Sequence, residues 1–388
     1  MIFKEALVDD TFRIMELYQR AESGNYQDLL FLDYKKLQEA IALETGIWMI
    51  ADSGHKVAAV VSGLIDPEQG ICKITRIHED KSFENSNLIT RQLLRAMLEL
   101  LKEKFPMIDL AYTSTFTMSM EHQRMTLDEG FKVLGIFPNA QGLDASKLNG
   151  LTGYFFNKTL EKKRDPEIRL HPKIMPFYEI TRKQCGLPML SVKPIDEQKS
   201  YDSDWNDVKT HFDLQLELIE APKFIEYQFE VLKSRRSQVI NFYPFHLPNA
   251  MVTSPDQQLR VFIKLDRMRR SAAIIGEHLI IQANPVEIYI KTLELLKASG
   301  AYYVELINDA ADVHGTECIL RAGFTPTAYV PAFKKQGNKR RDYVVFGRTY
   351  EYSCRPSPTA PKPYAEFFNQ YYELEMRNYF SSELIEES

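Results

Sequence analysis

Two residues that could do chemistry, His314 and Cys318, lie four positions apart in a stretch with helical spacing. Residues at i and i+4 share one face of a helix, so the pair could be two metal ligands or a thiol nucleophile beside a base. A structural zinc site needs four protein ligands, and no third partner lies nearby in the sequence. The other cysteines, Cys72, Cys185 and Cys354, are far apart and form no CxxC pair. We expect packing rather than a metal centre.

A basic run near the end of the second half of the chain is the other conspicuous cluster. It consists of Lys334, Lys335, Lys339, Arg340 and Arg341. Such a run is usually solvated, and its functional alternative is an anion contact to a phosphate or an acidic substrate. A nucleic-acid role is disfavoured because no stacking aromatics interleave with the basic residues. The sequence also lacks a Ser-His-Asp arrangement and a Walker-type glycine-rich loop.

Composition excludes several classes of protein. The chain has 388 residues, 44% of them hydrophobic, which predicts two or three globular domains. It has 48 Lys plus Arg against 53 Asp plus Glu, a net charge of −5, so we expect no nucleic-acid partner and no attraction to an anionic membrane. The sparse cysteines favour a reducing, cytoplasmic setting. Charges interrupt the N-terminal segment and no apolar run reaches the length of a membrane span, so we expect neither a signal peptide nor an anchor.

The length is best explained by an internal repeat of one folding unit. Residues 127–138 read LDEGFKVLGIFP and residues 320–331 read LRAGFTPTAYVP, with a Gly-Phe pair at the same distance before a proline. Upstream, 97–113 corresponds to 292–308, each a helix running into an apolar strand. Downstream, 153–161 parallels 342–351. Four elements therefore recur in one order: helix, strand, short helix ending at Gly-Phe, and strand pair.

The elements of the first half predict a mixed sheet covered on both faces. Short apolar runs parted by turn residues predict three antiparallel strands, and helical spacing follows in the next segment. The strands are expected at 48–51, 56–64, 71–78, 107–113, 130–138 and 151–160, and the helices at 10–22, 33–44, 88–105 and 118–129.

The rest of the chain is expected to join and repeat this unit. An amphipathic stretch over 168–188 predicts a linker helix that stops at a Gly-Leu-Pro sequence. The second half should contain strands at 189–195, 249–253, 259–265 and 272–282 and helices at about 205–218 and 222–234. A proline-rich stretch follows, and the aromatic residues of 364–387 predict a helix that docks. The expected domains are 1–161, the linker 162–188, 189–352, and 353–388.

This order of elements resembles the GNAT superfamily of acyl-CoA N-acyltransferases. The most specific pieces are Asp128-Glu129-Gly130-Phe131 and Arg321-Ala322-Gly323-Phe324, which match the superfamily's entry into a strand. The bridging segment 168–188 is similar to tandem members in which a helix joins two copies. The resemblance implies an α/β fold (α+β mixed sheet) made of two tandem GNAT-like folds, with acetyl-CoA as co-substrate, no metal, and an amine of a small molecule as the acyl acceptor.

The resemblance places the CoA pyrophosphate at the start of the helix that follows the strand ending at His78. Unpaired backbone N–H groups and the helix dipole suit an anion there. The superfamily usually has a basic residue and glycines in this loop, whereas this chain has Asn85-Ser86-Asn87 with no glycine. Asn and Ser still cap helices and tolerate tight turns. The expected cofactor-binding residues are Ile77, Asn85, Ser86, Asn87, Leu88, Ile89 and Thr90, although an ordinary capped helix is the alternative.

In the second copy, the passage from strand to helix, Ile281-Gln282-Ala283-Asn284-Pro285, is short, and Pro285 removes one anion donor. We expect this copy to be a structural or substrate-shaping partner. The tyrosine that the superfamily often places four residues before the Gly-Phe glycine, as a proton donor to the leaving thiolate, is replaced by Thr126 and Ile319.

Candidate groups for proton transfer are His122, Tyr112 and Glu79, with His78 beside it. In the second copy, Glu277 and His314 are weaker candidates. The sequence thus predicts an acyl-CoA-dependent N-acyltransferase with a possible homodimeric state. The alternative is a catalytically degenerate GNAT-like protein that binds a metabolite or a protein partner.

Overall fold

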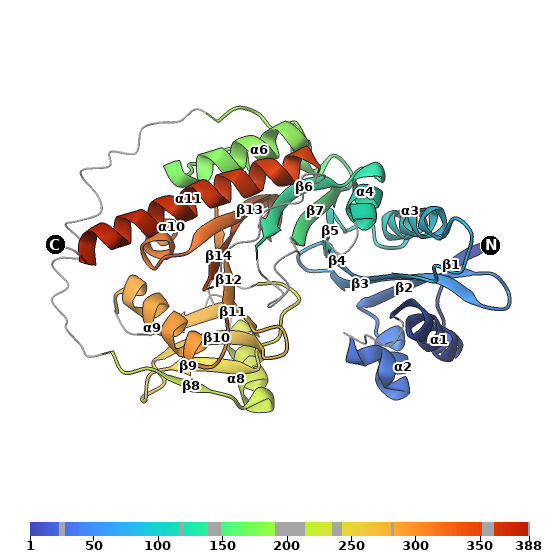
Figure 1. Ribbon diagram of the computed structural model, residues 1–388, viewed down its shortest axis with the longest axis horizontal. Helices are drawn as coiled ribbons and strands as arrows, with labels where there is room; N and C mark the ends of the chain where they lie inside the picture. The colour runs from blue at the N-terminus through green and yellow to red at the C-terminus, as the bar shows by residue number, and fades with distance from the viewer. Residues whose placement is uncertain are drawn as a thin grey trace. The chain divides into compact units, whose positions relative to one another are not determined.

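The computed structural model describes residues 1–22, 28–115, 120–138, 149–190, 214–234, 243–280, 283–350 and 361–386 (Figure 1). The chain divides into two compact units. Unit 1 comprises Met1–Val133 and Leu151–Lys163, and unit 2 comprises Leu134–Gly150 and Arg164–Ser388. Each unit is a mixed α/β structure with parallel and antiparallel strands in its sheet. In the part of the chain described here, no helix is both long and apolar enough to cross a membrane.

The sheet of unit 1 begins with four antiparallel neighbours and then changes direction. Strands β1 to β4 pair in sequence, β4 pairs with β5 in parallel, and β7 lies next to β5. A parallel neighbour needs a crossover, which here is a helix across one face of the sheet. The strands are β1 (Ile2–Glu5), β2 (Gly46–Asp52), β3 (Val57–Asp66), β4 (Ile71–Glu79), β5 (Leu110–Thr115) and β7 (Asn149–Phe155).

Helices cover both faces of this sheet (Figure 1). On one face Leu17 packs in a buried cluster with Trp48, and on the other Leu93 packs with Cys72. The first face carries α1 (Thr11–Glu22) and α2 (Tyr34–Ala42), and the second carries α3 (Ser86–Lys104) and α4 (Met120–Asp128). The short helices η1 (Val8–Asp10), η2 (Leu29–Leu32) and α5 (Thr159–Lys162) complete the described part of the unit.

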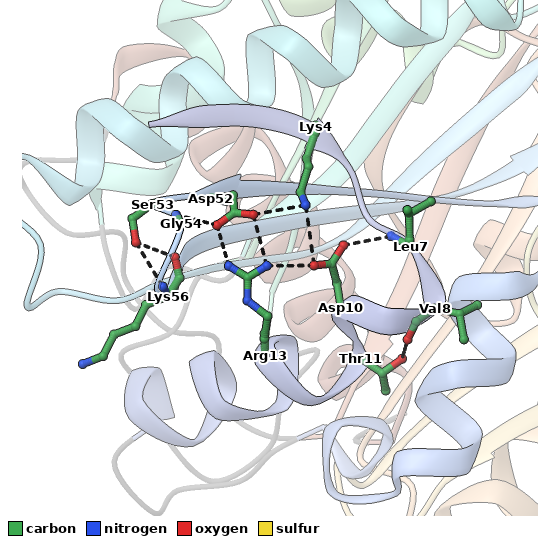
Figure 2. A network of polar contacts seen from close by, with 10 residues as sticks. All are labelled: Lys4, Leu7, Val8, Asp10, Thr11, Arg13, Asp52, Ser53, Gly54 and Lys56. Carbon is green, nitrogen blue, oxygen red and sulfur yellow. Dashed lines mark hydrogen bonds and ion pairs between the residues drawn. The ribbon is translucent and has the colours of Figure 1, made fainter.

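An ion-pair network ties β1, the start of α1 and the end of β2 together (Figure 2). Arg13 Nη1 donates to Asp52 Oδ2 at 3.0 Å and to Asp10 Oδ1 at 2.9 Å, and Lys4 Nζ lies 3.1 Å from Asp52 Oδ2. The hydrogen bond from Arg13 holds the pKa of Asp52 well below its usual range. The Asp52 carboxylate also accepts from the Gly54 N–H at 2.8 Å, which fixes the turn predicted between β2 and β3.

The sheet of unit 2 has the same kind of order. Strands β8, β9, β10 and β11 are antiparallel neighbours, β11 pairs with β12 in parallel, and β12, β14 and β13 follow with antiparallel pairing. These strands are β8 (Glu217–Ile219), β9 (Ala250–Thr253), β10 (Leu259–Asp266), β11 (Ser271–Leu279), β12 (Tyr303–Asp309), β13 (Thr325–Gln336) and β14 (Lys339–Thr349). The helices include α8 (Pro222–Ser234), α9 (Pro285–Ala298) and α10 (Val313–Arg321). Strand β6 (Lys132–Phe137) meets β13 where Gly135 faces Ala328, and a Cβ on Gly135 would lie 2.1 Å from the Ala328 Cβ.

A buried ion pair anchors the start of the linker in unit 2. The side chain of Arg164 is 2% exposed, and its guanidinium donates to both carboxylate oxygens of Asp342 at 2.7 to 3.0 Å. Tyr329 Oη donates to the same carboxylate at 2.6 Å, and the Ala332 N–H does so at 2.9 Å. Burial raises the pKa of the Asp342 carboxyl while Arg164 opposes that rise. Four donor groups, Arg164 Nε and Nη2, Tyr329 Oη and the Ala332 N–H, thus satisfy the buried carboxylate in place of water.

The linker helix and the C-terminal helix pack together in unit 2 (Figure 1). Helix α6 (Met175–Cys185), preceded by η3 (Pro172–Ile174), ends at Gly186 in the left-handed conformation, as the sequence predicted for its stop. Helix α11 (Lys362–Glu386) lies beside α6 and β13, with Phe367 6.2 Å from Phe177 between ring centroids. Tyr364, Phe367 and Tyr371 are buried. The prediction that the aromatic tail docks is confirmed.

Some predicted boundaries differ from the structure. The helix expected at about 205–218 is wrong at its end, because Glu217–Ile219 form strand β8, and its beginning lies outside the described residues. Of the strand expected at 189–195, the two described residues, Met189 and Leu190, are not in a strand, and the rest lies outside the described residues. The strand expected at 151–160 ends at Phe155, and α5 begins at Thr159. The Thr159 hydroxyl donates to the Asp109 carboxylate at 3.2 Å, a contact between positions fifty residues apart that local pattern cannot reveal.

Candidate functional site

Near their carboxyl ends, the neighbouring strands β4 and β5 stop pairing before either strand ends. Their parallel pairing runs from Ile71 opposite Leu110 to Ile74 opposite Thr113. At the next position, β4 carries a one-residue bulge: Gly63 of β3 pairs with Ile74, and the neighbouring Ser62 pairs with Arg76. A bulge bends its strand and often lies next to a functional site. In open α/β sheets, ligands bind outside the carboxyl ends of strands where neighbours part.

The bulge also decides which side chains of β4 face α3. Before it, Cys72 and Ile74 pack in the cluster beneath α3; after it, Ile77 packs against the same cluster and Glu79 contacts α3. Arg76 and His78 therefore face the other side of the sheet, because successive strand residues alternate. If the same residues alternated regularly from Ile74 onward, with Thr75 in the ladder and no bulge, Glu79 would lie on the opposite face to α3.

The start of α3 keeps the features expected of an anion site. Asn85 precedes the helix in the left-handed conformation, with φ 59° and ψ 36°, and its side chain makes no capping hydrogen bond. Asn is one of the few non-glycine residues that adopt this conformation. The Leu88 and Ile89 N–H groups both donate to the Asn85 carbonyl, at 2.9 and 3.1 Å. The helix start is thus formed without an acidic side chain in its first turn.

Glu79 lies beside this first turn and is buried, with 5% of its surface exposed. Its Oε2 accepts from Thr90 Oγ1 at 3.1 Å. The amide of Asn87, oriented with its nitrogen toward the carboxylate, donates to Oε1 at 3.1 Å and Oε2 at 3.2 Å. Two residues predicted to bind the cofactor, Asn87 and Thr90, therefore contact one predicted to be catalytic.

His78 lies apart from Glu79, on the opposite face of β4. Its ring meets Tyr18 and Phe31 edge-on, with centroids 5.0 and 5.2 Å away. Beside it, Arg76 Nε donates to Asp28 Oδ2 at 2.6 Å and its guanidinium lies over the Phe31 ring at 5.9 Å. These groups form a packed aromatic and ionic cluster against α1. Of these two alternative candidates at the strand end, Glu79 lies on the α3 side of β4 and His78 on the other.

The other two predicted catalytic residues are not brought together with Glu79. Tyr112 on β5 is buried and follows Ala111, which packs in the cluster beneath α3, so Tyr112 faces the opposite side of the sheet. His122 lies within α4, but its side chain is outside the described residues. Only Glu79 among the three has described contacts with the cofactor-binding residues.

Sequence reasoning missed an ionic clamp between α3 and the segment after α4. The Glu129 carboxylate accepts from Arg95 Nε and Nη2, both at 2.9 Å, and from Arg91 Nε. These hydrogen bonds lower the pKa of Glu129 against the opposing effect of burial. Glu129 precedes Gly130, whose φ of 89° suits glycine. The sequence signals for this clamp were Arg91 and Arg95, one helical turn apart, and the acidic Glu129 just before Gly130-Phe131.

In unit 2 the corresponding helix start is already capped. The Asn284 side chain accepts from the Val286 N–H at 3.0 Å, and Pro285 at the first helical position has no N–H. At α3 the Ser86 N–H donates to the Phe83 carbonyl and the Leu88 N–H to the Asn85 carbonyl, so neither helix start presents a fully open first turn.

Unit 2 contains a buried carboxyl that titrates near neutrality. Glu277 on β11 accepts from Tyr289 Oη of α9 at 2.7 Å. Burial raises the pKa of Glu277 to about 7, with a further rise from Asp312 and a lowering from the Tyr289 hydrogen bond. Burial likewise raises the pKa of Tyr289 well above its usual value. The sequence placed Glu277 on a strand but contained no signal for this environment.

His314 and Cys318, which lie four positions apart on α10, do not form a reactive site. Cys318 Sγ lies 3.9 Å from His314 Nε2, and burial raises the pKa of the thiol to about 11, so it is protonated at neutral pH. In the described ranges, no three His, Cys, Asp or Glu side chains are grouped to hold a metal ion. Cys72, Cys185 and Cys318 are free thiols.

The basic run is mostly engaged within unit 2 rather than forming an anion patch. Arg340 is 1% exposed and donates to the carbonyls of Ala332 and Phe333, each at 2.7 Å. Arg341 pairs with Asp309 at 3.3 Å, and Lys334 lies 4.7 Å from the centroid of Tyr343. Lys335 and Lys339 remain exposed.

Solved structures similar to this chain are acetyltransferases. The aminoglycoside 6'-N-acetyltransferase from Enterococcus faecium is 13% identical, with a TM-score of 0.35, over 40% of this chain and 97% of that one. A GNAT-family acetyltransferase from Streptococcus pneumoniae is 17% identical, with a TM-score of 0.34, over 40% and 98%. PaiA N-acetyltransferase from Thermoplasma acidophilum, in complex with coenzyme A, is 14% identical, with a TM-score of 0.31, over 40% and 100%. No protein-family model and no curated protein matches the sequence.

Proposed function

We propose that this protein is an acyl-CoA-dependent N-acyltransferase of the GNAT superfamily that uses acetyl-CoA and acylates an amine of a small molecule. The observation that carries the proposal is the end of β4–β5 pairing after Ile74, beside a helix start where the Asn85 side chain makes no capping hydrogen bond. Such a place binds a phosphate through backbone N–H groups and lets the rest of a ligand run between the parting strands.

We further propose that the two units are tandem copies of one fold. In unit 1, strands one to four of the sheet are antiparallel and the fifth is parallel to the fourth; unit 2 has the same pattern. Each fourth strand carries one extra residue, Thr75 in β4 and Ile275 in β11. A shared bulge in a shared topology supports duplication more strongly than the Gly-Phe pairs alone.

In this proposal the residues of unit 1 hold the co-substrate and manage one proton. The CoA thioester would supply the acyl group. Ile77 and residues 85–90 would bind CoA, with the backbone N–H groups of the first turn of α3 facing its pyrophosphate. Proton transfer from the attacking amine is assigned to Glu79, His122 or Tyr112. The left-handed Asn85 fits this role, because it turns the chain into the helix without occupying the cap.

The alternative function, a catalytically degenerate GNAT-like binding protein, keeps the fold without the chemistry. It is favoured by Thr126 and Ile319, which stand where the superfamily often has its tyrosine acid. Neither side chain is a proton donor of suitable acidity. Binding and turnover therefore have to be measured separately.

Ligand binding at α3 is tested by calorimetry and thermal unfolding with CoA and acetyl-CoA. Saturation at a hundredfold excess over Kd stabilises a protein by about 2.7 kcal/mol. The replacement Ser86→Trp, which fills the first turn of α3, should abolish this shift. Val286→Trp adds the same bulk to the first turn of α9 and should leave it intact.

The results distinguish an acyltransferase with its CoA site in unit 1 from a CoA site in unit 2 and from a binding protein without activity. Absence of CoA binding to the unaltered protein would refute the acyltransferase proposal. Loss of binding in Val286→Trp but not Ser86→Trp would move the site to unit 2. Acyl transfer to a panel of amines is measured by the release of free CoA thiol. Binding of acetyl-CoA without any such release would favour the degenerate alternative.

A further inference from the structure

We propose that Glu79 is a positioning residue: its buried carboxylate fixes the first turn of α3 and thereby sets the affinity of that turn for an anion. The carboxylate joins the end of β4 to two side chains on α3, those of Asn87 and Thr90. The inference deepens the proposed function and rests on it only for the identity of the anion.

The geometry gives the carboxylate a structural task. Thr90 is fully buried, and its hydroxyl, 3.1 Å from Glu79 Oε2, is also 2.9 Å from the Ser86 carbonyl in the preceding turn. Asn87 reaches the same carboxylate from the first turn. Glu79 thus gathers side chains from both ends of the segment 87–90. The positive end of the helix dipole, which favours an anion, lies at this turn.

The contacts of Glu79 with Thr90 and Asn87 favour a positioning role for its carboxylate over a role as the base that takes the proton of the amine. A carboxylate that accepts from Thr90 and Asn87 is oriented toward α3, and Tyr112 lies on the other face of the sheet. Its negative charge also stands beside the place where a pyrophosphate would bind, and like charges weaken each other's binding. We expect the charge of Glu79 to lower CoA affinity, and its hydrogen bonds to order the turn.

Three variants distinguish these effects. Glu79→Gln keeps hydrogen-bonding capacity toward Thr90 and Asn87 but removes the charge. Glu79→Ala removes both. Glu84→Gln is the matched control, because Glu84 lies exposed in the same loop and its replacement removes one charge without a buried contact.

The first readout is hydrogen exchange of the amides of 86–90 in the protein without ligand. Glu79→Ala should raise their exchange about tenfold, whereas Glu79→Gln and Glu84→Gln should stay near the unaltered protein. Unchanged exchange in Glu79→Ala, or equally fast exchange in Glu79→Gln, would overturn the positioning role. This readout needs no cofactor, so it decides the inference even if CoA does not bind and the proposed function fails.

The second readout is CoA affinity at low and high salt. Glu79→Gln should bind CoA about threefold or more tightly than the unaltered protein at low salt, with the difference shrinking as salt rises. Glu84→Gln should show a smaller gain. In turnover, a kcat lost about a hundredfold at unchanged KM in Glu79→Gln would identify Glu79 as the base and overturn the inference.

Discussion

The replacement Glu277→Gln should remove a pH dependence from the stability of unit 2. Glu277 is buried on β11, and burial is the main cause that raises its pKa from 4.5 to about 7. In the unfolded chain the group loses its proton near the ordinary value, so between these two pKa values the native state binds more protons than the unfolded state. The free energy of unfolding therefore falls as the pH rises through this window.

The magnitude follows from the size of the shift. One pKa unit corresponds to about 1.4 kcal/mol, so the shift of Glu277 corresponds to about 3 kcal/mol lost between the acidic and the neutral end of the window. Gln cannot ionise and keeps an oxygen that accepts from Tyr289. The variant should thus lack this decline, and its advantage over the unaltered protein should grow with pH.

The assay equilibrates the protein in urea between about pH 5 and about pH 8 and applies a short hydrogen-exchange pulse at one fixed pH. Peptides from β11 and α9 then report the unfolded fraction of unit 2 itself, which matters because two units need not unfold together. Glu294→Gln, on the exposed side of α9, is the matched control. Parallel pH profiles for Glu277→Gln and the unaltered protein would refute the reasoning.

Two further predictions concern the ionic anchors of the units. Asp342→Asn should destabilise unit 2 by about 3 to 5 kcal/mol, since it leaves the buried charge of Arg164 uncompensated; urea unfolding followed on β13 and β14 measures this, and a loss below 1 kcal/mol would contradict it. Asp52→Asn should lower the stability of unit 1 by about 1 to 2 kcal/mol at neutral pH, because Arg13 loses one of its two carboxylate partners and keeps only Asp10. The pKa of Asp52 is depressed in the folded state, so this contribution is present above its usual pKa of 3.8 and disappears as the pH falls further; an equal loss in strong acid would contradict it.

Local sequence signals were sufficient where the structure depends on neighbours in the chain. Turn residues were expected between the strands at 48–51 and 56–64, and in the structure the Asp52 carboxylate accepts from the Gly54 N–H there. The end of α6 was read from Gly186, which adopts the left-handed conformation. Turn and cap residues work within a few positions of themselves, so their meaning survives without tertiary context.

The candidate site was only partly predictable, because part of it depends on contacts between residues that are not neighbours in the sequence. The sequence identified the segment 85–90 as a helix start after a strand. It did not reveal the bulge at Thr75, because an extra residue in one strand is defined only by its partner strand. Alternation along the strand puts Glu79 and His78, two alternative candidates for proton transfer, on opposite faces, and the bulge decides that Glu79 is the one that contacts α3.

By itself the sequence determined most strands and helices of unit 1 and helix ends such as that of α6 at Gly186, since periodicity and turn chemistry are local. Only the tertiary structure decided that Arg164 pairs with Asp342, that Arg340 is internal, and that Glu277 titrates near neutrality. Burial and pairing of charges depend on groups far apart in the chain, and their energies arise when folding removes water from them.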